Sequence, residues 1–142
     1  MKLQTASAVI SFTRRLEDES AKFYEDLAQR YAEGKDTFLS FAKENGKNVV
    51  QIERTYYGVI SDALEGCFAF DVESDAYMVE TALAEDVNYR EALDKAIELE
   101  EKIGEFYSDA AEQSKSLMAD VPRIFAMIAK KRGIRVAKLR SL

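Results

Sequence analysis

Apolar and small residues recur along most of this chain at alternating steps of three and four, the pattern of a helix that buries one face. Gly34 is a helix terminator and Asp36 an N-cap candidate after it, while Asp120, with Pro122 in the next turn, is another N-cap candidate. The pattern predicts four helices, at about residues 6–33, 36–64, 89–114 and from 120 onward. Gly46 weakens the second helix by about 1 kcal/mol relative to alanine and predicts a close backbone approach.

A long segment without clean periodicity separates the two halves of the chain. Residues 65–88 are interpreted as a connection that contains one short helix near residues 76–84. The connection carries three aromatic residues, Phe68, Phe70 and Tyr77. Its length lets the second and third predicted helices run parallel, whereas the short links elsewhere predict antiparallel neighbours.

The two halves of the chain are related by an internal duplication. Residues 16–28 align with residues 99–111 and share Leu, Glu, Phe, Tyr, Asp and Ala at equivalent positions. The second predicted helix aligns with the fourth at a shift of 87 residues, which pairs Phe38 with Phe125. Two related helix hairpins joined by a long crossover predict an all-α four-helix bundle that spans residues 1–142 as a single domain.

Polar residues interrupt all four predicted inward faces near mid-length. Two acids stand on the first and third helices, two amides on the second and two arginines on the fourth: Glu17, Glu100, Asn45, Asn48, Arg132 and Arg135. Each acid precedes a tyrosine by seven residues, Tyr24 and Tyr107 respectively. An ionised carboxylate buried without a partner costs several kcal/mol or more, so each acid needs a cation or a raised pKa.

The charges of this cluster sum to zero, because two carboxylates face two arginines and two neutral amides. Arginine stays charged when buried, and its planar donor fork suits a carboxylate. We therefore expect the two arginines to pair with the two glutamates. We also expect the two tyrosines to donate to the same carboxylates and the two asparagines to take leftover donors.

The two Glu-x6-Tyr segments ending in Phe-Tyr, with the Phe-x-x-x-Ala lead-ins at Phe38 and Phe125, resemble the rubrerythrin-like branch of the ferritin-like superfamily. The resemblance covers nearly the whole chain outside the crossover. It implies a ferritin-like four-helix bundle, a di-iron cofactor for the family and pairing of helix faces in a homodimer. However, the family pattern has Glu-x-x-His where this chain has NGKN at residues 45–48 and RGIR at residues 132–135.

Only two of the six expected metal ligands, Glu17 and Glu100, therefore remain. The resemblance then implies a former metal centre, with no metal, no cofactor and no catalytic residue. We expect a structural or partner-binding bundle that forms a homodimer and binds an unknown protein partner. The alternative is a rubrerythrin-type oxidoreductase (a peroxidase or ferroxidase) or an iron-storage protein with a residual carboxylate site. A slipped register would bring Glu44 and Glu53 to the two acids as an all-oxygen site for a hard cation.

Three simpler interpretations remain open for the same residues. In the first, the two acids are partly exposed. In the second, the two arginines extend along a bundle edge towards solvent. In the third, the two tyrosines pack in the core with satisfied hydroxyl groups. For the tyrosines we favour this core role over a redox role.

Composition narrows the chemistry further. The chain has no histidine, which removes the commonest general base and a common metal ligand, and Cys67 is alone, which excludes an internal disulfide and a cysteine-only metal site.

Residues 121–142 carry seven Lys or Arg and no acid, within a net charge of −6. We expect this basic end to dock on its acidic neighbours rather than on nucleic acid. Apolar runs are too short for a membrane span or a secretory signal, so we expect a cytoplasmic protein.

Overall fold

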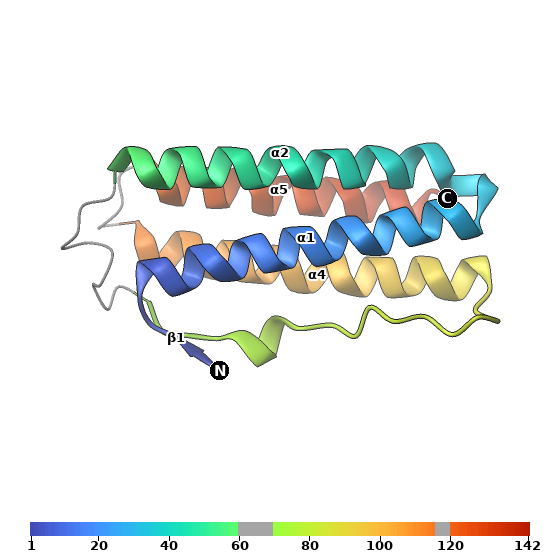
Figure 1. The fold of residues 1–142 in the computed structure, drawn as a ribbon, viewed down its shortest axis with the longest axis horizontal. Helices are drawn as coiled ribbons and strands as arrows, with labels where there is room; N and C mark the ends of the chain where they lie inside the picture. The colour runs from blue at the N-terminus through green and yellow to red at the C-terminus, as the bar shows by residue number, and fades with distance from the viewer. Residues whose placement is uncertain (60–69, 116–119) are drawn as a thin grey trace.

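Four long helices form the body of the protein in the computed structural model, which describes residues 1–59, 70–115 and 120–142. They are α1 (Ala6–Arg30), α2 (Lys35–Val59), α4 (Tyr89–Ser114) and α5 (Val121–Arg140). The closest packing is within two hairpins, α1 with α2 and α4 with α5 (Figure 1). The predicted all-α four-helix bundle with a long crossover is confirmed.

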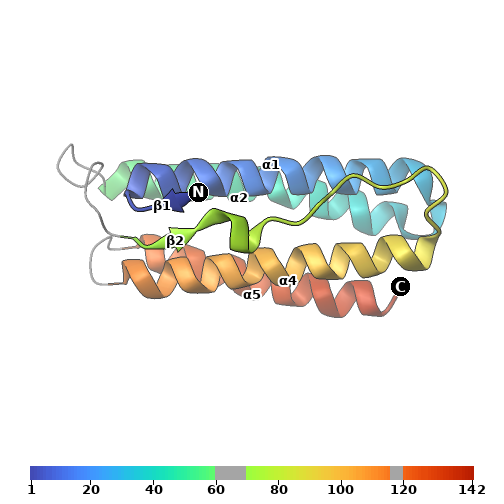
Figure 2. The ribbon, with the colours of Figure 1, turned by 90° about the horizontal axis from the view of Figure 1, so that it is seen from below.

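The crossover sets the directions of the helices. In Figure 1, α1 and α5 run from left to right, while α2 and α4 run from right to left. The chain leaves α2 at one end of the bundle and enters α4 at the other, so the second and third long helices are parallel, as predicted. Its described part runs alongside α1 and α4 (Figure 2). Phe70 is buried there, and the Tyr77 ring packs edge-on against Phe106 at 5.6 Å.

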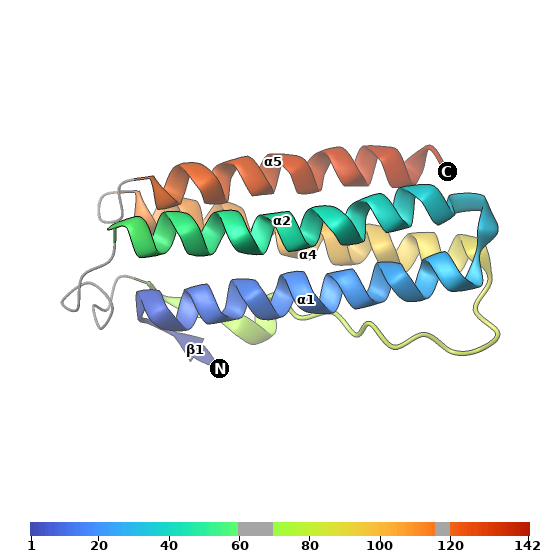
Figure 3. The same ribbon diagram turned by 45° about the horizontal axis from the view of Figure 1, so that its top comes forward.

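The opposite side of the bundle, between α2 and α5, is different. No described segment of the chain lies over these two helices (Figure 3). The described part of the crossover therefore covers one long face of the bundle, and no described segment covers the other.

Part of the crossover differs from the prediction. The short helix expected near residues 76–84 is wrong: β2 (Val72–Glu73) and η2 (Ser74–Tyr77) precede an extended segment. β2 pairs antiparallel with β1 (Lys2–Leu3), which no periodic pattern indicated because each strand has only two residues. Phe68 lies outside the described residues.

The turn between α1 and α2 is tighter than expected. Helix α1 ends at Arg30, and η1 (Ala32–Gly34) leads directly into α2. Asp36 is already in the first turn of α2, so its expected role as N-cap is wrong. A Cβ atom at Gly34 would lie 2.7 Å from the Phe38 ring and 2.8 Å from the Tyr89 hydroxyl. Glycine is therefore required here by close packing.

Of two further expectations at helix positions, the one for Gly46 is wrong and the one for Asp120 is confirmed. No atom lies within 4 Å of the position a Cβ would take at Gly46, so no backbone approaches it. Asp120 stands at the N-cap of α5 with Pro122 in the first turn, as predicted, although its side chain accepts no capping hydrogen bond. The predicted extension of the second helix over residues 60–64 lies outside the described residues.

The predicted inward faces are the buried faces of the helices. On α4, the residues expected to face inward are all buried: Leu93, Ala96, Glu100, Ile103, Tyr107 and Ala110. The residues expected to face inward from the first helix are also buried, namely Ile10, Thr13, Glu17, Ser20, Tyr24 and Leu27, except that Tyr31, which follows α1, is partly exposed. Aromatic rings from both hairpins meet in the core, for example Phe12 against Phe106 at 5.1 Å. None of the described helices combines the length and the apolarity that crossing a membrane requires.

Candidate functional site

The six polar residues predicted for the middle of the bundle come from all four helices, and all are buried. Glu17, Asn48, Glu100 and Arg132 are fully buried, and Arg135 is only 2% exposed. Partly exposed acids and arginines extended towards solvent are therefore excluded. Such complete burial of charges requires internal partners, because an unpaired buried ion is strongly unfavourable.

Arg132 of α5 joins the two central carboxylates. Its Nη2 donates to Glu17 Oε2 at 2.5 Å, and its Nη1 donates to both oxygens of Glu100, at 2.8 and 3.1 Å. The same Nη1 also lies 3.1 Å from the Ser20 hydroxyl oxygen, which accepts from it. One guanidinium therefore bridges α1 and α4, as charge pairing predicted. Burial by itself lowers the pKa of Arg132, but Glu100 and Glu17 outweigh it and raise the pKa above its usual value.

Arg135, one turn further along α5, links Glu100 to α2. Its Nη1 donates to Glu100 Oε1 at 3.1 Å, while its Nη2 donates to the Phe41 carbonyl oxygen at 3.0 Å. Its Nε and Nη2 both donate to Glu44 Oε1, at 3.0 and 2.8 Å. The guanidinium carbon also lies 4.8 Å from the centre of the Phe41 ring, within cation–π range.

The two tyrosines donate to the carboxylates in a crossed arrangement. Tyr24 of α1 donates to Glu100 of α4 at 2.6 Å, and Tyr107 of α4 donates to Glu17 of α1 at 2.8 Å. These bonds join the two hairpins, and the predicted donors are confirmed. Burial first, and then the adjacent carboxylate, raises the pKa of each tyrosine well above its usual value.

The two asparagines differ in role. Asn45 Oδ1 accepts from Arg135 Nη2 at 2.6 Å, as expected for a leftover donor. Asn48 instead donates through Nδ2 to Glu17 Oε1 at 3.3 Å, so the expectation for Asn48 is wrong. Among the described residues, Asn45 Nδ2, Asn48 Oδ1 and Arg132 Nε are buried without a hydrogen-bond partner.

The cluster contains one acid more than the sequence predicted. Glu44, whose side chain is 36% exposed, completes a set of three carboxylates around two guanidinium groups. The formal charge is therefore −1, and the predicted sum of zero is wrong. Glu44 directly precedes Asn45, and its position towards α5 rather than on the inward stripe is why periodicity did not select it. Ser20 was on the predicted stripe, but nothing marked it as an arginine acceptor.

The donor set does not suit a di-metal centre. In the part of the chain that the structure describes, no group of three or more acidic, histidine or cysteine side chains is arranged to hold a metal ion. The oxygens of Glu17 and Glu100 already accept from arginine and tyrosine. Two fixed guanidinium charges would also repel an added cation. Glu53, the other acid of the slipped-register alternative, pairs with Arg14 at 2.6 Å.

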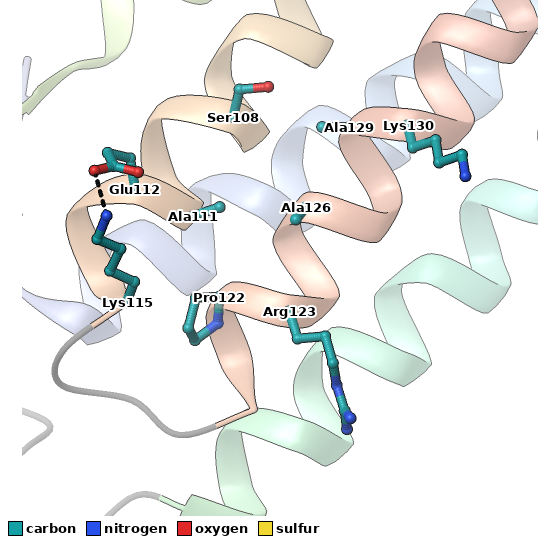
Figure 4. A pocket seen from close by; sticks show the side chains of 9 residues that line it. All are labelled: Ser108, Ala111, Glu112, Lys115, Pro122, Arg123, Ala126, Ala129 and Lys130. Atoms are coloured by element: carbon teal, nitrogen blue, oxygen red, sulfur yellow. Dashed lines mark hydrogen bonds and ion pairs between the residues drawn. The ribbon is translucent and has the colours of Figure 1, made fainter.

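A surface hollow of about 660 Å³ lies between α4 and α5, apart from this cluster. Figure 4 shows that the short side chains of Ala111, Ala126 and Ala129 form its wall. Glu112 at its edge is paired with Lys115 at 2.8 Å (Figure 4). The hollow therefore results from small residues on two packed helices, with the charged side chains of Glu112, Lys115, Arg123 and Lys130 around them.

Comparison with protein-family models, with curated proteins and with solved structures finds no match. The fold and the cluster define only a class: an all-α four-helix bundle with a buried Glu/Arg salt-bridge network.

Proposed function

We propose that this chain is a degenerate ferritin-like, rubrerythrin-like protein in which a salt-bridge cluster replaces the di-iron centre. It acts as a non-catalytic structural or partner-binding bundle. The observation that carries the proposal is the position of Arg132, whose guanidinium lies between the two carboxylates that the resemblance would give to metals. The duplicated Glu-x6-Tyr segments and the parallel pair α2 and α4 support the same relationship.

The environment of the cluster supports a non-catalytic role. A general acid or base must reach a substrate and titrate near the working pH. Here Glu17 and Glu100 are sealed from solvent, and the raised pKa values of Tyr24 and Tyr107 keep both phenols neutral. The groups that resemble a reaction centre are therefore used to hold the helices together.

The same cluster fixes how the two helix hairpins align along the bundle. A buried ion pair often adds little net stability compared with apolar residues, but an unpaired buried charge is strongly unfavourable. Because Arg132 must meet Glu17 on α1 and Glu100 on α4, only one alignment of the hairpins satisfies all three charges. This geometry favours a rigid scaffold on whose surface a partner can bind.

Metal content tests the proposal. The untagged protein is incubated anaerobically with ferrous iron, manganese or zinc, desalted and analysed by elemental mass spectrometry. We expect less than about a tenth of an equivalent of each metal, because the carboxylates are already bound to guanidinium groups. The variant Arg132→Gln, which frees carboxylate oxygens while preserving much of the side-chain volume, shows whether arginine is what excludes the ion.

Two tightly held equivalents in the natural protein would overturn the proposal. Peroxidase and ferroxidase assays would then follow, because the oxidoreductase or iron-storage alternative would be correct. The accompanying proposal of a homodimer is tested by sedimentation equilibrium, where we expect twice the chain mass of 16.1 kDa.

A further inference from the structure

Besides Lys35 at the start of α2, six basic side chains on α2 and α5 have no acidic partner among the residues that the structure describes. They are Lys43, Lys47, Arg54, Lys130, Lys131 and Lys138. Most other basic side chains are paired, for example Arg14 with Glu53 at 2.6 Å and Lys95 with Glu98 at 3.3 Å. The unpaired positive charge is thus concentrated on the two helices over which no described segment lies.

Four of these cations border a groove. A hollow of about 480 Å³ is lined by residues of both helices: Ser40, Lys43, Glu44, Lys47 and Lys131. A second hollow of about 660 Å³ shares Lys43 and Lys47 and continues along α2 to Arg54. We call this continuous surface, with Lys43, Lys47, Arg54 and Lys131 on its walls, the basic groove. Among the described residues, Glu44 is the one acid that lines it, and its carboxylate accepts from Arg135.

Exposed apolar side chains accompany the basic groove. Val50 is 54% exposed and lies in the second hollow, and Tyr57 is 67% exposed on the same helix stripe, since it follows Val50 by seven residues. Ile134 of α5 is 60% exposed and follows Lys131 by three residues. The surface therefore combines free positive charge with apolar contact area.

We propose that the basic groove docks an acidic, amphipathic helix of a protein partner. This inference rests on the partner-binding function proposed above and names where the partner binds and what chemistry it presents. A helix laid in a groove places apolar side chains on the groove floor and carboxylates against the flanking lysines. Such a helix would lie in the hollow between α2 and Lys131 of α5 and extend over the hollow along α2.

Other occupants fit less well. A nucleic-acid backbone supplies the negative charge, but it offers no apolar partner to Val50 and Ile134, and a flat anionic membrane does not fill a hollow. A second copy of this chain would have to offer α4, its most acidic helix. However, the exposed acids of α4 are largely engaged within their own chain, as Glu101 is with Arg140 at 3.5 Å and Glu105 with Lys102 at 3.6 Å.

The test measures binding of a labelled peptide by fluorescence anisotropy, with EDTA present so that metal plays no part. The peptide has about 22 residues, enough for a stable helix, with leucine on one face and glutamate on both flanks. We expect saturable binding that weakens as salt is raised, because screening shortens the reach of the exposed charges. A peptide with every glutamate replaced by glutamine, and one with its leucines replaced by serine, should each bind at least about tenfold more weakly.

Matched protein variants locate the site. We expect Lys43→Gln with Lys47→Gln to reduce affinity for the acidic peptide about tenfold. Lys22→Gln with Lys35→Gln removes two other unpaired cations, on α1 and at the far end of α2, and should change affinity less than about twofold. Val50→Ser should also weaken binding, because it removes the exposed apolar side chain that lines the second hollow. Circular dichroism of each variant confirms that the bundle is intact.

Several results would overturn the docking proposal. These are absence of peptide binding, equal losses in the two lysine pairs, and tighter binding to single-stranded oligothymidine or to phosphatidylserine vesicles than to the peptide. Salt-sensitive self-association that disappears in the Lys43 and Lys47 variant would assign the groove to a second copy. None of these outcomes depends on metal content, so the non-metal bundle and the docking groove can fail separately.

Discussion

Both sides of α5 carry basic residues, but those on the inner side are buried and those on the outer side are not. On the inner side, Arg132 and Arg135 are buried and make charge-assisted hydrogen bonds to carboxylates. On the outer side, Lys130, Lys131 and Lys138 have no carboxylate partner among the described residues. Burial, rather than charge itself, decides which of these residues controls folding.

The choice of side chain follows the same division. Arginine is inside, where its rigid fork satisfies two carboxylates at once, and lysine is outside, where a strongly hydrated point charge remains in water. An inner charge that loses its partner is stranded, whereas an outer charge is already solvated. We therefore expect substitutions on the inner side to alter stability and substitutions on the outer side to alter binding.

The largest effect is expected for Arg132→Leu. The substitution leaves Glu17 and Glu100 with much less positive charge in a sealed interior, which should cost roughly 3–5 kcal/mol in the free energy of unfolding. Urea unfolding followed by circular dichroism measures it. Lys131→Leu, the neighbouring residue on the outer side, is the control and should stay within about 0.5 kcal/mol of the natural protein. Equal effects at both positions would refute the division between the two sides.

High pH should destabilise the bundle through its two buried tyrosines, Tyr24 and Tyr107. The folded pKa of Tyr24 and of Tyr107 is raised above the unfolded value, so their stabilising contribution is complete below pH 10 and is lost as pH rises above it. Each tyrosine should then lower the free energy of unfolding by about 1.4 kcal/mol per pH unit. Absorbance at 295 nm during a base titration should show both phenols ionising only as the bundle unfolds.

The double variant Tyr24→Phe with Tyr107→Phe tests this assignment. It should be less stable at neutral pH, because two hydrogen bonds to carboxylates are lost, but its stability should fall less steeply above pH 10. An unchanged slope would mean that other groups cause the alkaline loss. Tyr77 is one such group, because burial and its hydrogen bond to Asp109 raise its pKa to about 12.

The inner side of the bundle was predictable because helical periodicity is strict there. A polar residue such as Glu17 or Arg132 in an apolar stripe is conspicuous, and charge balance then named its partner. The crossed tyrosine bonds were not predictable in detail, because sequence spacing does not tell which helices adjoin. The outer side was harder: the lysines of α2 and α5 meet only through tertiary packing, so the basic groove has no linear signature.

Glu44 lies at the boundary between the two sides, because it accepts from buried Arg135 and also lines the basic groove. Its substitution should therefore give the smallest change in stability together with a change in binding. Glu44→Gln leaves Arg135 with Glu100, Asn45 and the Phe41 carbonyl, and the lost pair is partly solvated, so unfolding should cost about 0.2–1 kcal/mol less. Removing this acid from the groove should also strengthen binding of the acidic peptide about twofold. A loss near that of Arg132→Leu would place Glu44 with the inner charges, and weaker peptide binding would show that the groove does not recognise negative charge.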